Sequence, residues 1–122
     1  MQFSFRKEEK LKSEKLIKEL FEKGSSFYSF PFKVSFMLNP DQSAPFHQIL
    51  ISVSRKNFKR AVDRNLIKRR TRESYRLNKN LLKDSPRLVI AYIYTAKEIL
   101  TFAQIQDRLI KTLKRFDHVE KI

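Results

Sequence analysis

Residues 52–76 read SVSRKNFKRAVDRNLIKRRTRESYR. From Arg55 to Arg76 this stretch has ten Arg or Lys residues against only Asp63 and Glu73, so it supplies +8 of the net charge of +14. Repulsion among like charges on one short segment costs stability, and a compact domain tolerates it where a fixed polyanion offsets it. Seven of the ten are Arg, whose planar guanidinium binds phosphate oxygens in pairs and stacks on bases. The stretch therefore indicates binding to a nucleic acid.

The same stretch has the periodicity of an amphipathic helix. At about 100° per residue, its polar side chains fall in one arc of about half a turn: Arg60, Arg64, Asn65, Lys68, Arg69, Arg72 and Arg76. The opposite side is predicted to pack on the protein and comprises Val62, Leu66, Ile67 and Leu77. Asn57 as N-cap predicts a helix start near residues 58–60.

Length and composition predict one domain over residues 1–122, because 41% hydrophobic content supports a single modest core. The chain has no Cys, which excludes disulfides and thiolate metal sites. No apolar run is long enough to cross a bilayer, and residues 1–12 lack the hydrophobic core of a signal peptide. We therefore expect a cytoplasmic protein that does not bind membranes.

The flanking segments complete an α+β pattern. A helix is predicted from the N-cap Ser13 to about Lys23, and a last helix from Thr101, which forms a capping-box pattern with Gln104. Residues 30–38 and 46–54 are predicted as two antiparallel strands joined by a turn, and the apolar run 88–94 as a central strand. The predicted order is α-β-β-α-β-α, and the predicted fold is a single-domain α-β sandwich with one sheet.

Side chains suited to catalysis are few. His47 and His118 show no metal-ligand spacing and are predicted to be structural or at the surface. The single Gly excludes a glycine-rich phosphate loop, and no pair of carboxylates suited to two metal ions is evident. We expect that the protein alone does not break bonds.

Aromatic side chains offer a second means of binding RNA. The chain has eleven Phe residues, and unpaired bases stack on exposed rings without sequence preference. Phe21 is the first candidate for such a platform, and its alternative role is packing in the core.

The central stretch resembles the signature of the bacterial ribonuclease P protein subunit. The matching runs are Ser52-Val53-Ser54-Arg55-Lys56 and Ala61-Val62-Asp63-Arg64-Asn65-Leu66-Ile67-Lys68-Arg69-Arg70-Thr71-Arg72-Glu73. Leu20-Phe21-Glu22-Lys23-Gly24 and Leu88-Val89-Ile90-Ala91 match the family's pattern on either side. The resemblance covers nearly the whole chain.

The resemblance implies a protein that binds a large catalytic RNA and helps it to remove the 5′ leader from precursor tRNA. The RNA subunit would hold the Mg²⁺ ions and carry out the hydrolysis, and the protein alone is expected to be monomeric. Contacts to the catalytic RNA carry over to Arg55, Lys56, Arg64, Asn65, Lys68, Arg69 and Arg72. A cleft for the leader carries over to Lys12, Ile17, Phe21, Lys33 and Ser35.

The resemblance also implies a fold like that of the second domain of ribosomal protein S5, with a left-handed crossover around the basic helix. Leu66 stands where the family has a second Arg, so packing is expected to replace one RNA contact there.

Two other classes of protein share the composition. A ribosomal or other structural RNA-binding protein would be as basic and would have no part in an enzyme. A protein on anionic lipid would need an inserting apolar face, which Arg70 and Glu73 interrupt.

Overall fold

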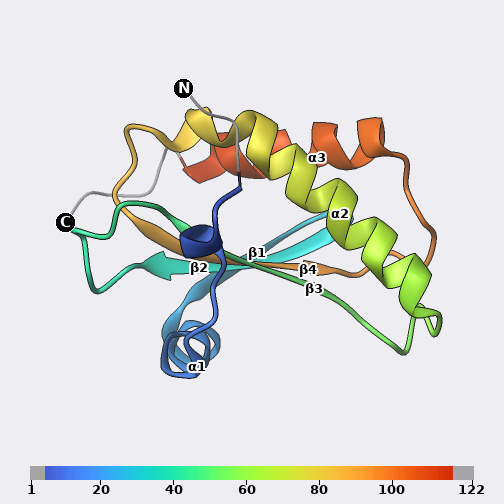
Figure 1. Ribbon diagram of the computed structural model, residues 1–122, viewed down its shortest axis with the longest axis horizontal. Coiled ribbons are helices and arrows are strands. Elements are labelled where there is room, and N and C mark those ends of the chain that lie inside the picture. The colour runs from blue at the N-terminus through green and yellow to red at the C-terminus, as the bar shows by residue number, and fades with distance from the viewer. Residues whose placement is uncertain (1–4, 117–122) are drawn as a thin grey trace.

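A four-stranded mixed sheet lies between α1 on one side and α2 and α3 on the other (Figure 1). The structure, a computed structural model, describes residues 5–116. The strands are β1 (Ser25–Ser29), β2 (Phe32–Leu38), β3 (Gln48–Val53) and β4 (Leu88–Tyr94). The helices are α1 (Glu14–Lys23), α2 (Ala61–Asn78) and α3 (Phe102–Arg115), with the 3-10 turns η1 (Lys7–Glu9) and η2 (Lys79–Leu82).

The predicted α+β class is confirmed, but the predicted pairing of the two strands before α2 is wrong. The sheet order is β1-β2-β4-β3, so β4 lies between β2 and β3. Ala91 of β4 lies beside Ser35 of antiparallel β2 and beside Leu50 of parallel β3. Six of the seven β4 residues are buried, and only a central strand covered on both faces gives an all-apolar run such an environment. β1 is an additional strand that the sequence pattern did not predict.

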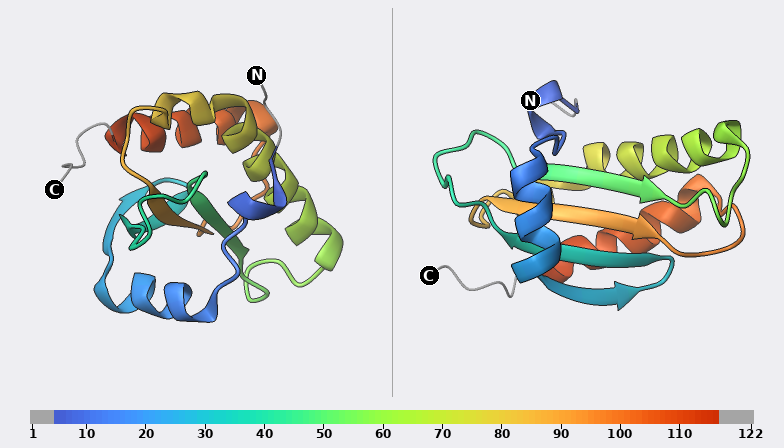
Figure 2. Two further views of the ribbon diagram at one scale, coloured as in Figure 1. Left: turned by 60° about the vertical axis from the view of Figure 1, so that its left-hand side comes forward. Right: turned by 90° about the horizontal axis from the view of Figure 1, so that it is seen from below.

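The connection from β3 through α2 to β4 is left-handed. In the right-hand view of Figure 2, β3 and β4 both point to the right with β4 below β3, and α2 passes behind them. Such connections between parallel strands are right-handed in nearly all proteins. The hand that the family resemblance implies is therefore the one observed.

Local capping explains where α1 and α3 begin. Ser13 Oγ accepts a hydrogen bond of 3.2 Å from the Leu16 amide, and Thr101 and Gln104 form the predicted capping box. α1 ends at Gly24, where a Cβ atom would lie 2.4 Å from the Leu20 carbonyl oxygen and 2.9 Å from that of Phe36. Only glycine allows the strand to approach the helix end so closely.

Two layers of core pack on the two faces of the sheet. The larger cluster lies between the sheet and the helices α2 and α3. It includes Phe32, whose ring centroid lies 5.2 Å from that of Tyr92 and 6.0 Å from that of Tyr94. The smaller cluster lies under α1 and consists of Leu11, Leu20, Val89 and Ala91. α1 crosses only part of its face (Figure 2), and this is the side of the sheet to which the family resemblance assigns the leader.

Candidate RNA-binding interface

The basic loop, residues 54–60, holds two predicted contact residues away from the core. The Phe58 amide donates to the Ser54 carbonyl at 3.0 Å, and the buried Phe58 ring packs against Tyr94 at 6.0 Å. Because this ring anchors the loop, Arg55 and Lys56 are exposed at its tip. The loop therefore presents two cations on a fixed backbone.

Arg64 ties this loop to the first turn of α2. Its Nη1 donates to the carbonyl oxygens of Phe58 at 2.8 Å and Lys59 at 2.9 Å, and the side chain is half-buried. The helix itself begins at Ala61, with Arg60 rather than Asn57 as N-cap. Arg64 therefore has a structural role in holding the basic loop, in addition to its predicted contact with RNA.

The face of α2 that packs on the protein is rotated by part of a turn from the predicted one. Its buried residues are Ile67, Thr71, Ser74 and Tyr75, whereas Val62 is 59% exposed. The hydroxyls of Thr71 and Ser74 donate to the carbonyls four residues before them, at 2.9 and 2.8 Å. Two small polar side chains can therefore lie in the core, and a pattern based on apolar residues alone does not find them.

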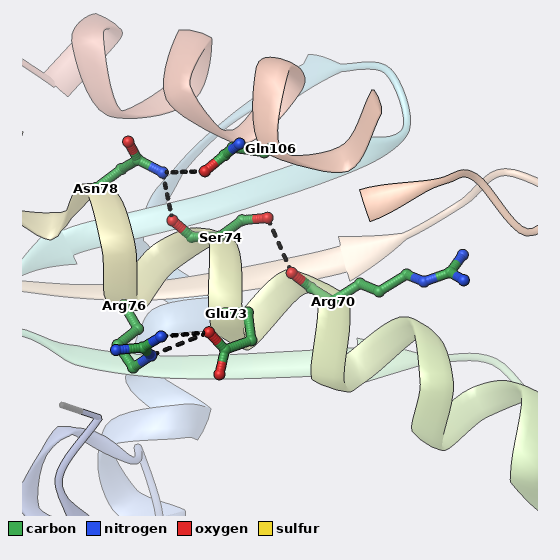
Figure 3. Close-up of polar contacts among 6 residues, drawn as sticks. All are labelled: Arg70, Glu73, Ser74, Arg76, Asn78 and Gln106. Carbon is green, nitrogen blue, oxygen red and sulfur yellow. Dashed lines mark hydrogen bonds and ion pairs between the residues drawn. The ribbon is translucent and has the colours of Figure 1, made fainter. Parts of the chain in front are cut away.

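The side of α2 that meets α3 is fixed by polar contacts (Figure 3). Asn78 Nδ2 donates to the Ser74 carbonyl at 2.8 Å and to Gln106 Oε1 of α3 at 3.0 Å. Arg70 Nη1 donates to the Leu100 carbonyl at 2.6 Å, which holds α2 against the loop that leads into α3. These contacts set which residues of α2 face outward.

The outward face of α2 carries the other predicted contacts. Asn65 and Arg69 are exposed, whereas Lys68 and Arg72 are half-buried on the side toward the N-terminal arm, residues 5–12. Leu66 is half-buried, consistent with packing at the position of the family's Arg. Arg76, also in the predicted polar arc, forms an ion pair with Glu73 at 2.6 Å (Figure 3).

The predicted leader residues lie on the α1 side of the sheet. Lys33 and Ser35 lie two residues apart on β2 and therefore on the same face of the sheet, with Lys33 exposed and Ser35 buried. Ile17 packs against the core cluster under α1, and Phe21, one turn later, is 50% exposed. The structure therefore gives Ile17 and Ser35 packing roles and leaves Phe21 and Lys33 accessible.

The missed strand β1 adds a residue to this face. Tyr28 pairs with Lys33, and Lys33 pairs with Ile93, which pairs with Ser52. Residues paired in this way share one face of the sheet, so an exposed Tyr lies beside the predicted Lys33. The sequence pattern for β1 is weak, because three of the five residues in Ser25–Ser29 are Ser rather than the β-branched or aromatic residues typical of strands.

The two predicted sets of residues meet at a basic hollow. Lys12 of the leader set lines it together with Lys68 and Arg72 of α2 and with Lys10, which was not predicted. The hollow has a volume of about 250 Å³, an apolar floor that includes Leu50 and Ile51, and no acidic residue in its lining. It is suited to a phosphate beside an apolar surface.

The arrangement of metal-ligating side chains in the described part of the chain bears on the chemistry available at this interface. Among residues 5–116, no group of three or more His, Cys, Asp or Glu residues could hold a metal ion. His47 is buried away from it, accepts from the Leu88 amide at Nδ1 (3.0 Å) and lies with Nε2 3.2 Å from the Leu82 carbonyl. Burial lowers the pKa of His47, so its ring is neutral and structural. His118 lies outside the described residues.

No helix among the described residues is long and apolar enough to span a membrane. The fold and interface together define a small cationic α+β protein of the kind that binds RNA.

Comparison with known proteins identifies the family. The family model for ribonuclease P matches residues 5–117. The ribonuclease P protein component of Porphyromonas gingivalis is 35% identical over 118 residues, covering 93% of this chain and 86% of the relative. The component of Petrotoga mobilis is 29% identical, covering 93% and 96%. The chain belongs to the ribonuclease P protein family.

Solved structures of the family have the same fold. The RNase P protein of Thermotoga maritima superposes with a TM-score of 0.74 at 28% identity, covering 93% of this chain and 99% of that one. The RNase P protein of Staphylococcus aureus gives a TM-score of 0.73 at 28% identity, covering 88% and 97%. The family resemblance expected from the basic stretch is confirmed.

Proposed function

We propose that this chain binds the catalytic RNA of ribonuclease P with its basic loop and α2, and the 5′ leader of precursor tRNA with the α1 side of its sheet. The assembled ribonucleoprotein removes the leader as an endoribonuclease. The RNA subunit holds Mg²⁺ and hydrolyses the phosphodiester. The proposal places the protein in the cytoplasm with its precursor tRNA substrates, and as a monomer before assembly.

The observation that supports this proposal most is the basic hollow. Lys12, next to α1, lies at the same hollow as Lys68 and Arg72 of α2. One surface of the protein can therefore contact two RNA segments that meet beside it. Tyr28 and Phe21, farther along the α1 side of the sheet, have exposed rings on which leader bases can stack.

The benefit of such a protein is electrostatic. Substrate and catalytic RNA repel each other, and Mg²⁺ at high concentration is one means of screening that repulsion. A protein of net charge +14 between them lowers the cost of their approach. We therefore assign the protein a positioning role.

The test is cleavage of a precursor tRNA at low Mg²⁺ by the cognate catalytic RNA, with and without the protein. Activity that needs both components supports the proposal. Cleavage by the protein alone would mean that the chemistry has been assigned to the wrong subunit. If the protein has no effect and instead binds ribosomal RNA, the structural RNA-binding alternative is correct.

A further inference from the structure

A second hollow lies at the other end of α2 from the basic loop. It has a volume of about 370 Å³ and is formed by the N-terminal arm, the loop before β3 and the 3-10 turn η2. We call it the η2 hollow and define it by Arg6, Phe46, Lys83 and Arg87. α2 has 18 residues and is therefore about 27 Å long, so this hollow is remote from Arg55 and Lys56.

The η2 hollow has an excess of positive charge. Arg6, Lys79, Lys83 and Arg87 line it, and the one carboxylate in the lining is Glu9. Glu9 is buried, with both oxygens 2.9 Å from Lys79 Nζ, and it also accepts from the Arg6 amide at 2.8 Å. Glu9 therefore offsets one of the four cations, and the others remain to attract an anion.

The wall of the η2 hollow is partly aromatic and fixed in place. The Arg6 guanidinium carbon lies 5.7 Å from the centre of the Phe46 ring, and Pro45 is next to that ring. Arg87 Nε donates to the Ala44 carbonyl at 2.8 Å, which holds the loop that carries Phe46. Cations beside a half-buried ring provide the two contacts that an unpaired nucleotide needs, one for the phosphate and one for the base.

The hollows of this region adjoin one another around the N-terminal arm. A third hollow is lined by Pro45 and Phe46, which it shares with the η2 hollow. It is also lined by Lys10 and Lys12, which it shares with the basic hollow, and by Lys7, Glu8 and Asp41, so three Lys residues face two carboxylates there. A single strand of RNA leaving the basic hollow therefore has a concave path past Lys10 and Lys12 to Phe46.

We propose that the η2 hollow binds one unpaired nucleotide of single-stranded RNA, with its phosphate near Lys83 and Arg87 and its base against Phe46. This inference rests on the proposed function, because it extends the RNA path beyond the basic hollow. The nucleotide comes either from the distal part of the leader or from an unpaired segment of the catalytic RNA. Both have the same chemistry, and the experiment distinguishes them.

The test uses the full-length protein with Lys83→Glu and, separately, Phe46→Ala. Lys83 is exposed, so its charge reversal should leave the melting temperature unchanged. Lys114→Glu, an exposed change on α3 outside the hollow, is the matched control for charge. Two affinities are measured for each protein: that for the catalytic RNA, and that of the assembled holoenzyme for precursors with a short and a long single-stranded leader.

A nucleotide in the η2 hollow predicts about tenfold weaker binding by both hollow variants, but not by the control. A loss in affinity for the catalytic RNA identifies that RNA as the source. If the variants lose only the additional affinity that the long leader gives over the short one, the leader is the source of the nucleotide. If both hollow variants are folded and change neither affinity, the proposal is wrong. Failure of the wild-type protein to bind either RNA would instead overturn the proposed function.

Discussion

Glu9 and Lys79, 70 residues apart, form a buried ion pair in which Lys79 Nζ lies 2.9 Å from each carboxylate oxygen. The side chains are 2% and 16% exposed, respectively. The pair fastens the N-terminal arm to the end of α2, and the Leu11 amide fastens the same arm to the Ile49 carbonyl at 2.9 Å. Lys10 and Lys12 therefore reach the basic hollow from a fixed backbone.

Removing one partner of this ion pair should destabilise the protein. Lys79→Met leaves Glu9 buried without its cation, and we expect a loss of about 3 kcal/mol in the free energy of unfolding. Glu9→Gln should cost less, because Lys79 retains some contact with solvent. Urea unfolding of the free protein measures both values. Equal stability of Lys79→Met and wild type would show that the pair does not hold the arm.

Arg69 and Arg64 should behave differently when truncated. Arg69 is exposed on α2, so Arg69→Ala should weaken binding to the catalytic RNA and lower the salt slope of that binding by about 1, without changing stability. Arg64→Ala should also lower the free energy of unfolding by about 2 kcal/mol, because it removes two hydrogen bonds from a charged donor to the loop.

Filter-binding titrations at several salt concentrations, together with thermal melts, separate the two effects. Lys56→Ala, in the same basic loop, is the control for loss of an exposed charge there. If Arg64→Ala melts like wild type, its contacts to Phe58 and Lys59 do not support the loop.

Phe21→Ala should act on the substrate rather than on the fold. Half of the Phe21 side chain is exposed, and a base stacked on it would contribute about 1 to 3 kcal/mol. We expect weaker binding of precursor tRNA by the holoenzyme and an unchanged affinity for mature tRNA. Phe30→Ala, also an exposed Phe but in the turn between β1 and β2, is the control. A large loss of stability with no effect on precursor binding would place Phe21 in the core instead.

His47 makes folding stability depend on pH. Burial lowers the pKa of His47 below its ordinary value of 6.5, and the positive charge of Arg87 acts in the same direction. The unfolded chain therefore binds more protons below pH 6.5. This contribution to stability is present above pH 6.5 and is lost as the pH falls from 6.5 toward the lower pKa of the folded state.

Urea unfolding between about pH 5.5 and 7.5 measures this dependence, in a range set by the ordinary His pKa. His47→Gln should flatten it. The same slope in His47→Gln as in wild type would show that another group is responsible.

Local patterns predicted the elements that depend on their own sequence. The capping residues Ser13 and Thr101 mark the starts of α1 and α3, and the predicted strand 88–94 is β4. Each of these signals lies within a few neighbouring residues. The exposed positions of Arg55, Lys56 and Arg69 also follow from local charge.

Long-range packing determined what the sequence pattern missed. β2 and β3 do not pair because β4 lies between them. β4 begins some 35 residues after the end of β3, and its pairing with β3, which places Leu50 beside Ala91, is not visible in the local sequence. The packing face of α2 depends on Thr71 and Ser74, whose hydroxyls bond to their own helix. The approach of Lys12 to Lys68 and Arg72 depends on how the arm pairs with the edge of β3.

The most direct measurement is the affinity of the assembled holoenzyme for precursor tRNA and for the mature tRNA made from it. The proposed grip on the leader adds contacts that mature tRNA lacks, so we expect the precursor to bind at least tenfold more tightly. The RNA subunit alone should show less preference than the holoenzyme. Equal affinity of the holoenzyme for precursor and mature tRNA would contradict a leader-binding role for this protein.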